Sequence, residues 1–294
     1  MTSYLRSFAA DGERKKIWTF GKNGGDFELR AIKKVAVKFY LYAPKGPQGR
    51  DYAFEDKLAS LEEMFGEEFW KTVCTGFVNL GDEAVRKALS LLAAVMWMRN
   101  PLHLQSMHDM HSQIVDFIQQ APELPDEIEL NGKVVPIDKE SWPTYRDAGE
   151  DDIKRMWLKH LGSATWLAEL LMKMRWSILL SEKPVFITSD NPVVALHPTL
   201  RFRGIENPET TLAFPLSPTR VLHMDNRHSE PDNQYYPLKV SPGYINSLMW
   251  RYALNSMFSS RPTEEVCAEM CAEAEAQGYH WQPGGWLPDG KIEP

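Results

Sequence analysis

The sequence predicts an α+β fold, with β-strands at the N-terminus, a mostly helical middle, and a strand pair that carries the loop ITSDNP, all packed as one unit. Two observations predict it. Short runs of β-branched and aromatic residues occur near the N-terminus and in the C-terminal half, and apolar residues at three- and four-residue spacing lie between them. Because no repeat or low-complexity linker divides the 294 residues, we expect a single domain over 1–294, with a small excursion at 121–147.

The first fifty residues are typical of β structure. The runs KIWTF, DFELRAI and VAVKFYLYA are rich in β-branched and aromatic side chains. Asn23-Gly24, between the first two runs, favours the tight turn of a hairpin. We therefore expect a hairpin followed by a third strand.

Helices are expected from residue 53 onward. Residues 53–73 are predicted to form one amphipathic helix, because apolar side chains recur there at helical spacing: Phe54, Leu58, Leu61, Phe65 and Phe69. Asp82 is an N-cap residue for a second helix that is apolar nearly all round and ends near Pro101. A third helix is expected to run through residue 120, and the excursion after it contains the hairpin IELNGKVV.

The C-terminal half is expected to combine both kinds of element. A long helix from about Asp151 to Leu180 leads into the strand PVFIT, and TLAFPLSP and RVLHMD form a further strand pair. Helices are predicted at 242–258, where Pro242 takes the first helical position, and at 263–277. The aromatic, Gly- and Pro-rich tail that follows is predicted to be irregular.

The composition argues against several classes of protein. No apolar run approaches the ~20 residues that cross a bilayer, and the start lacks the apolar stretch of a secretory signal, so we expect a cytoplasmic protein without membrane contact. Three cysteines are too few for a disulfide framework. The patterns of P-loop ATPases, Rossmann dehydrogenases, serine hydrolases with a nucleophile elbow, and zinc fingers do not occur.

The charge is distributed unevenly. The whole chain has a net charge of -7, yet residues 1–50 hold eleven Lys and Arg side chains against four Asp and Glu. A basic N-terminal segment can bind an anionic ligand or nucleic acid, or it can pair with the acidic remainder of its own fold. The second interpretation is favoured, because these charges do not alternate with the aromatic and glycine residues of RNA-binding sheets.

The stretch PVFITSDNPVV carries the most information about function. A strand that ends in consecutive polar residues holds their side chains at the edge of a sheet. Asp190 can accept hydrogen bonds or bind a cation, and Ser189 supplies a short-range donor. The alternative is an Asx-type turn in which Asp190 only bonds to nearby backbone before Pro192. Local chemistry favours the turn.

Several stretches together resemble one family. ITSDNPVV follows the Trp-containing segment at Trp176, FPLSP comes some twenty residues later, and YLRSFA, FEDKLASLEE and RNP occur earlier in the chain. The pattern resembles the bacterial proteins catalogued as domain of unknown function 4238, over approximately residues 4–260. The resemblance implies a fold and a site around ITSDNP, but no reaction. A His-containing stretch that usually precedes the YLR element in the family is not matched here, so a role for that histidine does not carry over.

Carboxylates at the helix expected over 53–73 suggest a metal site. At 100° per residue, Glu55 and Glu62 lie within about 20° of each other at the border of the apolar stripe. Together with Asp190 they could bind Mg²⁺ or Mn²⁺, which activates water or holds a phosphate. The alternative, which local chemistry favours, is that both are solvated and pair with Lys57 or the basic N-terminal segment.

Other candidate residues have structural alternatives as well. His103, His108 and His111 fall within a roughly 140° arc of one helix, but an apolar stripe next to His111 favours packing over metal binding. Arg6 and Arg99 could each hold an anionic ligand, or each could bridge a carboxylate inside the fold.

Two functions are consistent with these residues, and the sequence does not decide whether the chain is an enzyme. The leading hypothesis is a metal-assisted hydrolase for a phosphorylated or nucleic-acid substrate, with Asp190, Glu55 and Glu62 as metal ligands. Arg6 or Arg99 would then hold the phosphate. The alternative is a non-catalytic binding or interaction protein, as an accessory of a defence or toxin-type system, in which the SDNP turn only shapes a surface.

Overall fold

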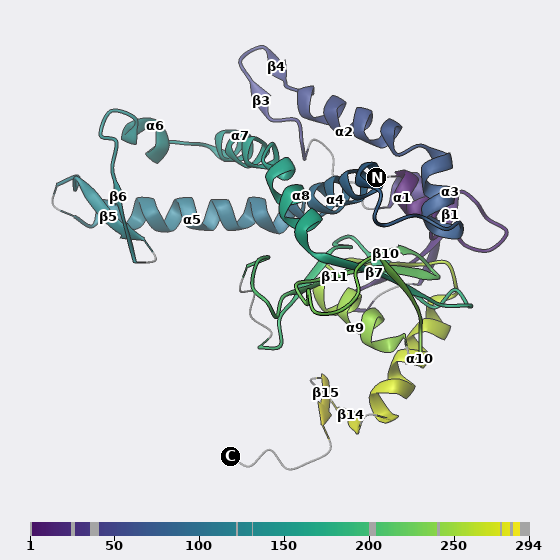
Figure 1. Cartoon of the computed structure of the whole chain (residues 1–294). Helices are drawn as coiled ribbons and strands as arrows, with labels where there is room; N and C mark the ends of the chain where they lie inside the picture. Colours follow the sequence, from purple (N-terminus) through teal and green to yellow (C-terminus); the bar gives the residue numbers. More distant parts are fainter. Residues whose placement is uncertain are drawn as a thin grey trace. The chain divides into compact units, whose positions relative to one another are not determined.

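The computed structural model (Figure 1) describes residues 2–24, 27–35, 41–121, 123–130, 132–199, 204–239, 242–276, 278–282 and 285–288. It contains helices and several sheets, so the predicted α+β fold is confirmed. The chain forms two compact units. The first unit comprises Met1–Val37, Leu61–Trp97 and Thr165–Pro294, and the second comprises Lys38–Ser60 and Met98–Ala164. The expected single domain over residues 1–294 stays a prediction.

The larger sheet of the first unit has the strand order β12-β7-β11-β10-β9. Its strands are β7 (Arg175–Leu180), β9 (Val194–Leu196), β10 (Thr211–Ser217), β11 (Arg220–Asp225) and β12 (Gln234–Pro237). β12 runs parallel to β7, and the other neighbours are antiparallel. β10 and β11 are the strand pair predicted from TLAFPLSP and RVLHMD, and most of their residues are buried.

The smaller sheet of the first unit has the order β2-β1-β13-β8. Its strands are β1 (Lys16–Gly21), β2 (Glu28–Ala31), β8 (Thr188–Ser189) and β13 (Ser256–Ser259). β1 and β2 confirm the predicted hairpin, and Gly24 in its turn has a φ of 87°, which glycine adopts without strain. Residues 36–40 of the expected third strand lie outside the described residues. Because β13 lies between β1 and β8, the N-terminal hairpin and the ITSDNP loop belong to one sheet.

Helices of the first unit pack beside these sheets: α1 (Thr2–Arg6), α3 (Glu67–Thr75), α4 (Glu83–Met98), α8 (Ala164–Lys173), α9 (Gly243–Tyr252) and α10 (Thr263–Ala276), with a 3-10 turn η1 (Ile32–Lys34). α4 begins as predicted, because the Asp82 carboxylate accepts from the amides of Ala84 and Val85 at 2.9 and 3.1 Å. It is apolar on nearly all sides because it is a buried helix.

The helix predicted over 53–73 is wrong in one respect, since two helices replace it. α2 (Ala53–Met64) ends before Phe65, and α3 starts after Gly66, whose backbone is extended, with ψ at 175°. Glycine loses the most conformational freedom in a helix, so a break at Gly66 costs little. The apolar spacing that predicted one helix continues across the break and does not reveal it.

Two other predicted helices extend too far. The segment expected to be one helix from Asp151 to Leu180 contains α7 (Glu150–Leu161), then α8, then strand β7. Residues 167–180 are nearly all apolar, and such a run fits a buried strand as well as a buried helix. The helix predicted at 242–258 ends at Tyr252, because the chain turns there into β13. The tail predicted to be irregular forms a small hairpin of β14 (Tyr279–Gln282) and β15 (Gly285–Pro288).

The second unit contains α5 (Pro101–Gln119), α6 (Trp142–Arg146), α7 and two small hairpins. These hairpins are β3 (Lys45–Gly46) with β4 (Gly49–Arg50), and β5 (Glu127–Leu130) with β6 (Lys133–Pro136). The second hairpin was predicted from IELNGKVV. α5 begins at Pro101, and Asn100 caps it by accepting from the Leu102 amide at 2.9 Å. Tyr42 stacks on Trp157 in the core of this unit, with ring centroids 5.6 Å apart.

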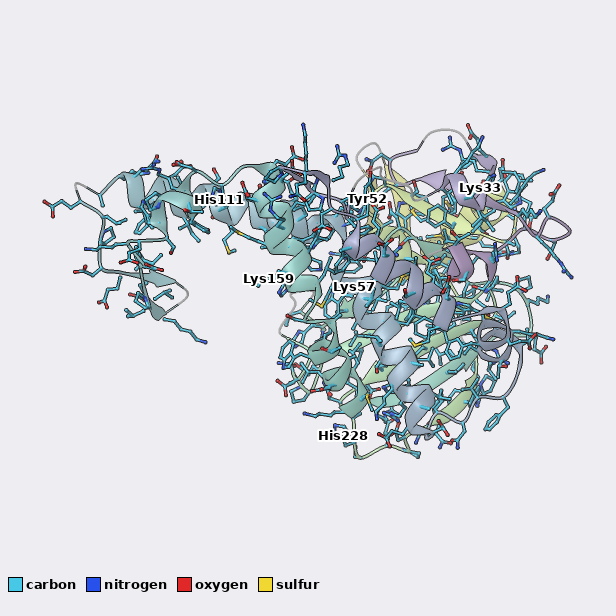
Figure 2. All side chains as sticks on the ribbon, turned by 90° about the horizontal axis from the view of Figure 1, so that it is seen from above. Lys33, Tyr52, Lys57, His111, Lys159 and His228 are labelled. Atoms are coloured by element: carbon cyan, nitrogen blue, oxygen red, sulfur yellow. The ribbon has the colours of Figure 1, made fainter. Side chains whose placement is uncertain are left out.

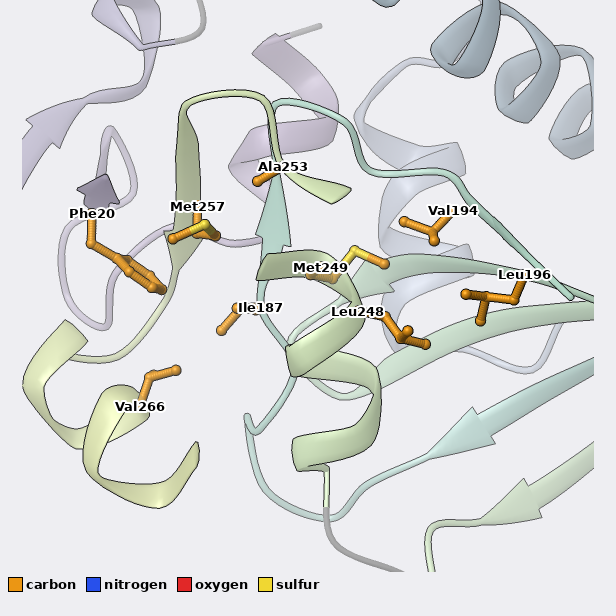
Figure 3. Packing of buried hydrophobic residues seen from close by; sticks show 9 residues of the cluster. All are labelled: Phe20, Ile187, Val194, Leu196, Leu248, Met249, Ala253, Met257 and Val266. Carbon is orange, nitrogen blue, oxygen red and sulfur yellow. The ribbon is translucent and has the colours of Figure 1, made fainter. Parts of the chain in front are cut away.

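A buried apolar cluster of the first unit joins β1, the residues around ITSDNP, α9, β13 and α10 (Figure 3). Its members are Phe20, Ile187, Val194, Leu196, Leu248, Met249, Ala253, Met257 and Val266. Apolar burial of this kind contributes roughly 25 cal/mol per Å² removed from water. The cluster therefore fixes α9 and α10 against the loop that the sequence singles out.

In the described part of the chain, no helix combines the length and apolarity that a bilayer crossing requires.

Candidate functional site

The Asp190 carboxylate is bonded to the backbone that follows α9. Oδ1 accepts from the amide of Leu254 at 2.8 Å, and Oδ2 accepts from the amides of Asn255 and Ser256 at 2.9 and 3.1 Å. The Asp190 amide donates in return to the Ser256 carbonyl at 3.0 Å. Asp190 thereby holds the corner at which the chain leaves α9 and enters β13.

Burial raises the pKa of Asp190 above its ordinary value, while the three backbone amides act in the opposite direction. Both carboxylate oxygens already have donors. The sequence analysis offered a local Asx-type turn as the alternative to a catalytic or metal-binding role, whereas the amides that Asp190 binds belong to a distant segment.

The neighbours of Asp190 in the ITSDNP loop are also bonded within the fold. Asn191 Nδ2 donates to the Tyr252 carbonyl at 2.9 Å, and Ser189 Oγ accepts from the Asn191 amide at 3.1 Å. The hydroxyls of Thr188 and Tyr4 lie 2.6 Å apart, and Tyr4 donates to the Pro215 carbonyl at 2.7 Å. The loop therefore connects α1, β10 and the end of α9.

A residue of α9 completes this network and was not predicted. Asn246 is 2% exposed; its Oδ1 accepts from the Ile187 amide at 3.0 Å and its Nδ2 donates to the Val185 carbonyl at 2.9 Å. The signal in the sequence is an amide side chain on the face of α9 that also carries Ile245 and Met249, a buried place where a polar group needs partners. The spacing of apolar residues in this segment predicts only a helix.

The other predicted site residues of the first unit lie at its surface or its N-terminus. Arg6 Nη1 is 3.5 Å from Glu67 Oε1, with the two side chains 54% and 87% exposed, so this ion pair adds little stability. Glu62 Oε2 accepts from the Thr2 amide at 3.3 Å, which agrees with the predicted pairing of Glu62 with the N-terminal segment.

Glu55 and Arg99 belong to the second unit, where both act on Tyr42. Burial raises the pKa of Tyr42 above its ordinary value. The positive charge of Arg99 opposes this increase, and the negative charge of Glu55 adds to it. The Tyr42 hydroxyl donates to the Arg99 carbonyl at 3.3 Å.

The metal set of Asp190, Glu55 and Glu62 draws on both units and stays a prediction. Within the ranges that the structure describes, no three His, Cys, Asp or Glu side chains are placed to share a metal ion.

The basic N-terminal segment is partly neutralised by its own fold. Lys16 is 3.1 Å from Glu13, Arg30 pairs with Glu28, and Lys22 Nζ donates to the carbonyls of Arg251 and Ala253 at 2.8 Å each. These three side chains therefore bond within the protein, but Lys16 and Arg30 do so with acids of the same segment rather than with the acidic remainder that the sequence analysis favoured. Lys33, labelled in Figure 2, remains exposed at η1.

His111 packs as the sequence predicted. It is half-buried on α5 (labelled in Figure 2). Its Nε2 lies 2.7 Å from the Tyr145 carbonyl, and its ring contacts the Tyr145 ring.

A pocket of about 1050 Å³ opens in the first unit between the β9–β10 edge, α9 and α10. Its apolar wall is formed by Leu196, Leu248, Trp250 and Met270. Its polar side chains come from the ends of strands and from the two helices: His197, Glu209, Thr211, Arg227, Tyr244, Ser247, Arg251, Cys271 and Glu273. None of these residues was predicted as a site. The one signal in the sequence is the spacing of Tyr244, Ser247 and Arg251, which places them on one face of α9.

The ITSDNP loop positions one wall of this pocket. Trp250 and Arg251 line the pocket at the end of α9, and the next residue, Tyr252, is held by Asn191. The Lys22 ammonium bonds the Arg251 carbonyl, and the Lys22 carbonyl accepts from Trp250 Nε1 at 3.2 Å. A cation at the C-terminus of a helix also interacts favourably with the helix dipole. The loop and the N-terminal hairpin therefore fix the orientation of the pocket wall.

His197 is the buried polar group of the pocket, at 7% exposure. Its Nδ1 accepts from the Thr199 amide at 3.2 Å and lies 2.8 Å from the Thr199 hydroxyl. In the neutral ring the proton is then on Nε2, which lies 3.4 Å from Glu209 Oε2. Thr199 and Glu209 together fix the tautomer and the orientation of the His197 ring.

The fold and this geometry define an α+β protein with an internally bonded loop motif beside a pocket of the size that binds small molecules. The chain belongs to the family described as "Protein of unknown function (DUF4238)", whose model matches residues 2–267. The family membership expected from the sequence is thereby confirmed. No curated protein and no solved structure was found to match the chain.

Proposed function

We propose that this protein is a non-catalytic binding protein and that its ligand occupies the pocket between β9, β10, α9 and α10. The pocket itself is the observation that carries the proposal. Its volume of about 1050 Å³ lies just above the usual range for small-molecule sites, roughly 300–1,000 Å³. An apolar wall with a few convergent polar side chains is also typical of such sites.

The ITSDNP loop supports binding over catalysis. A metal-assisted hydrolase, the leading hypothesis from the sequence, needs a carboxylate with free oxygen lone pairs facing a metal or substrate. Asp190 instead accepts three backbone hydrogen bonds, and Ser189 Oγ is occupied by the Asn191 amide. These contacts are what a loop needs to hold the pocket wall in place, so the geometry favours a structural role for the loop.

Blocking the pocket tests the proposal. The probe is N-phenyl-1-naphthylamine, a neutral aromatic amine whose fluorescence rises in apolar sites. We expect saturable binding of one equivalent to the wild-type protein. Ala274→Trp places an indole in the pocket and should weaken the affinity at least about tenfold, since the apolar contact area is then occupied.

The matched control is Ala272→Trp, on the same helix but exposed and outside the pocket lining. It should bind the probe as the wild type does, and thermal melts should confirm that all variants fold. Ser247→Trp blocks the same pocket from α9 and replaces Ala274→Trp if that variant is unfolded. Absence of saturable binding to the wild type, or equal affinity in the blocked and control variants, would contradict the proposal.

A further inference from the structure

We infer that the ligand of this pocket is an amphipathic anion, with an apolar chain or ring and one carboxylate, phosphate or sulfonate head. This inference rests on the proposed function and adds the chemical class of the ligand. It follows from the way in which the charged side chains of the pocket are already used. The acidic side chains contact other groups of the protein, while in the part of the chain that the structure describes the two arginines have no ion-pair partner.

The two carboxylates of the pocket are engaged. Glu209 Oε2 lies 3.4 Å from His197 Nε2, which carries the ring proton. The Glu273 carboxylate packs against Gly243, the first residue of α9, so closely that a side chain at Gly243 would collide with it. A negative charge at the N-terminus of a helix is stabilised by the helix dipole and the free backbone amides. Both carboxylates therefore already interact with groups of the protein at the edge of the pocket.

The two guanidinium groups of the pocket are different. Arg227 follows β11 and Arg251 lies at the end of α9, and both are exposed side chains of the lining. Over the described ranges of the chain, neither guanidinium has an ion-pair partner. The backbone of Arg251 is held by Lys22, so its side chain starts from a fixed point. Guanidinium groups bind carboxylate and phosphate through paired hydrogen bonds.

The rest of the lining is suited to the apolar part of such a ligand. Leu248 and Leu196 belong to the buried cluster, and Trp250 and Met270 pack against it with part of their surface open to the pocket. Aromatic and thioether side chains contact rings and alkyl chains of many shapes. The apolar wall and the arginines line the same pocket, so a single molecule can contact both.

Two probes with the same aromatic skeleton separate the charge from the apolar contact. 1-Anilinonaphthalene-8-sulfonate carries an anionic sulfonate, and N-phenyl-1-naphthylamine carries none. In Arg227→Gln and Arg251→Gln we expect the dissociation constant of the sulfonate to rise about threefold to tenfold each, because a charge-assisted contact at an exposed site is lost. The neutral amine should bind all variants within twofold of the wild type. Arg14→Gln, an exposed arginine outside the pocket, is the control for net charge.

Displacement of the sulfonate probe identifies the head group. Octanoate, octyl phosphate and octanol share one chain length and differ in their heads. Either anion should displace the probe at a lower concentration than octanol, and added salt should reduce this preference. Equal displacement by octanol, or an unchanged sulfonate affinity in both arginine variants, would overturn the inference while leaving the binding proposal intact. If neither probe binds the wild type saturably, the proposed function fails and the inference fails with it.

Discussion

Asp190 and Ser256 exchange two hydrogen bonds: the Ser256 amide donates to Asp190 Oδ2 at 3.1 Å, and the Asp190 amide donates to the Ser256 carbonyl at 3.0 Å. This exchange extends the pairing of β8 with β13 by one residue, through a side chain. The Asp190 carboxylate also explains why α9 stops at Tyr252. It accepts from the amides of Leu254 and Asn255, which would otherwise continue the hydrogen bonding of the helix. The ITSDNP loop therefore determines where the pocket wall ends.

Replacing Asp190 should reduce stability. Asp190→Ala leaves the amides of Leu254, Asn255 and Ser256 without their acceptor, and we expect a loss of about 1–3 kcal/mol in the free energy of unfolding. Urea unfolding measures it. Asp116→Ala, an exposed residue of α5, should change stability by less than about 0.5 kcal/mol. A variant of Asp190 as stable as the wild type would show that the three hydrogen bonds contribute nothing.

The fold could be predicted from the sequence where local signals are strong. Asp82 and Asn100-Pro101 mark the starts of α4 and α5, and two short apolar runs separated by a turn mark β10 and β11. β7 was missed because it directly follows an apolar helix and its first four residues are all buried, polar and apolar alike, so no inside–outside alternation marks it as a strand. The end of α9 was missed because it depends on Asp190, more than sixty residues away.

The candidate site was harder to predict than the fold. ITSDNP identifies Asp190 as unusual, but its partners are backbone amides, which any residue could supply. The pocket is made by residues from β9, β10, α9 and α10, and no local pattern links His197 to Arg251. Such convergence depends on the tertiary fold, so sequence periodicity indicates only which face of each element is polar.

A buried ion pair joins β7 and β11, two neighbouring strands of the larger sheet. Asp225 is 1% exposed and accepts a bidentate contact from Arg175, with Nε at 2.8 Å from Oδ1. Asp225→Asn should cost about 2–4 kcal/mol, because it leaves a buried guanidinium without its full partner. In the double variant Arg175→Met, Asp225→Leu, much of this loss should be recovered, since no buried charge is then left unpaired; Glu230, which also pairs with Arg175, is half-exposed and stays solvated. Urea unfolding of the single and double variants checks both statements.

The same pair should make the protein sensitive to acid. Burial acts to raise the pKa of Asp225, but the Arg175 guanidinium and the Arg227 amide outweigh it and hold the pKa below its ordinary value. The stability from ionised Asp225 is therefore complete above about pH 4 and is lost as the pH falls through the folded-state pKa. Asp225→Asn should flatten the unfolding free energy below pH 4 relative to the wild type. Parallel curves would contradict this.

His223 should control stability near neutral pH. Burial lowers the pKa of His223; Arg175 and Arg227 lower it further, while Asp225 and Glu230 act in the opposite direction. Because the unfolded chain takes up the proton at a higher pH than the folded chain does, stability should fall as the pH drops below about 6.5. His223→Gln should remove part of this dependence between pH 7.5 and 5.5. His228→Gln, at an exposed position labelled in Figure 2, should retain it.

Gly243 and Glu273 should be energetically coupled at the edge of the pocket. A Cβ on Gly243 would collide with the Glu273 carboxylate, which can rotate away only by leaving the N-terminus of α9. Gly243→Ala alone should thus destabilise the protein or leave it unchanged. In the Glu273→Ala background the same change should stabilise it by up to about 1 kcal/mol, because alanine restricts the unfolded chain and favours the helix. Thermal or urea unfolding of the wild type, the two single variants and the double variant gives the coupling energy between the two positions. If Gly243→Ala changes stability equally in both backgrounds, the position of the Glu273 carboxylate does not require the absence of a side chain at Gly243.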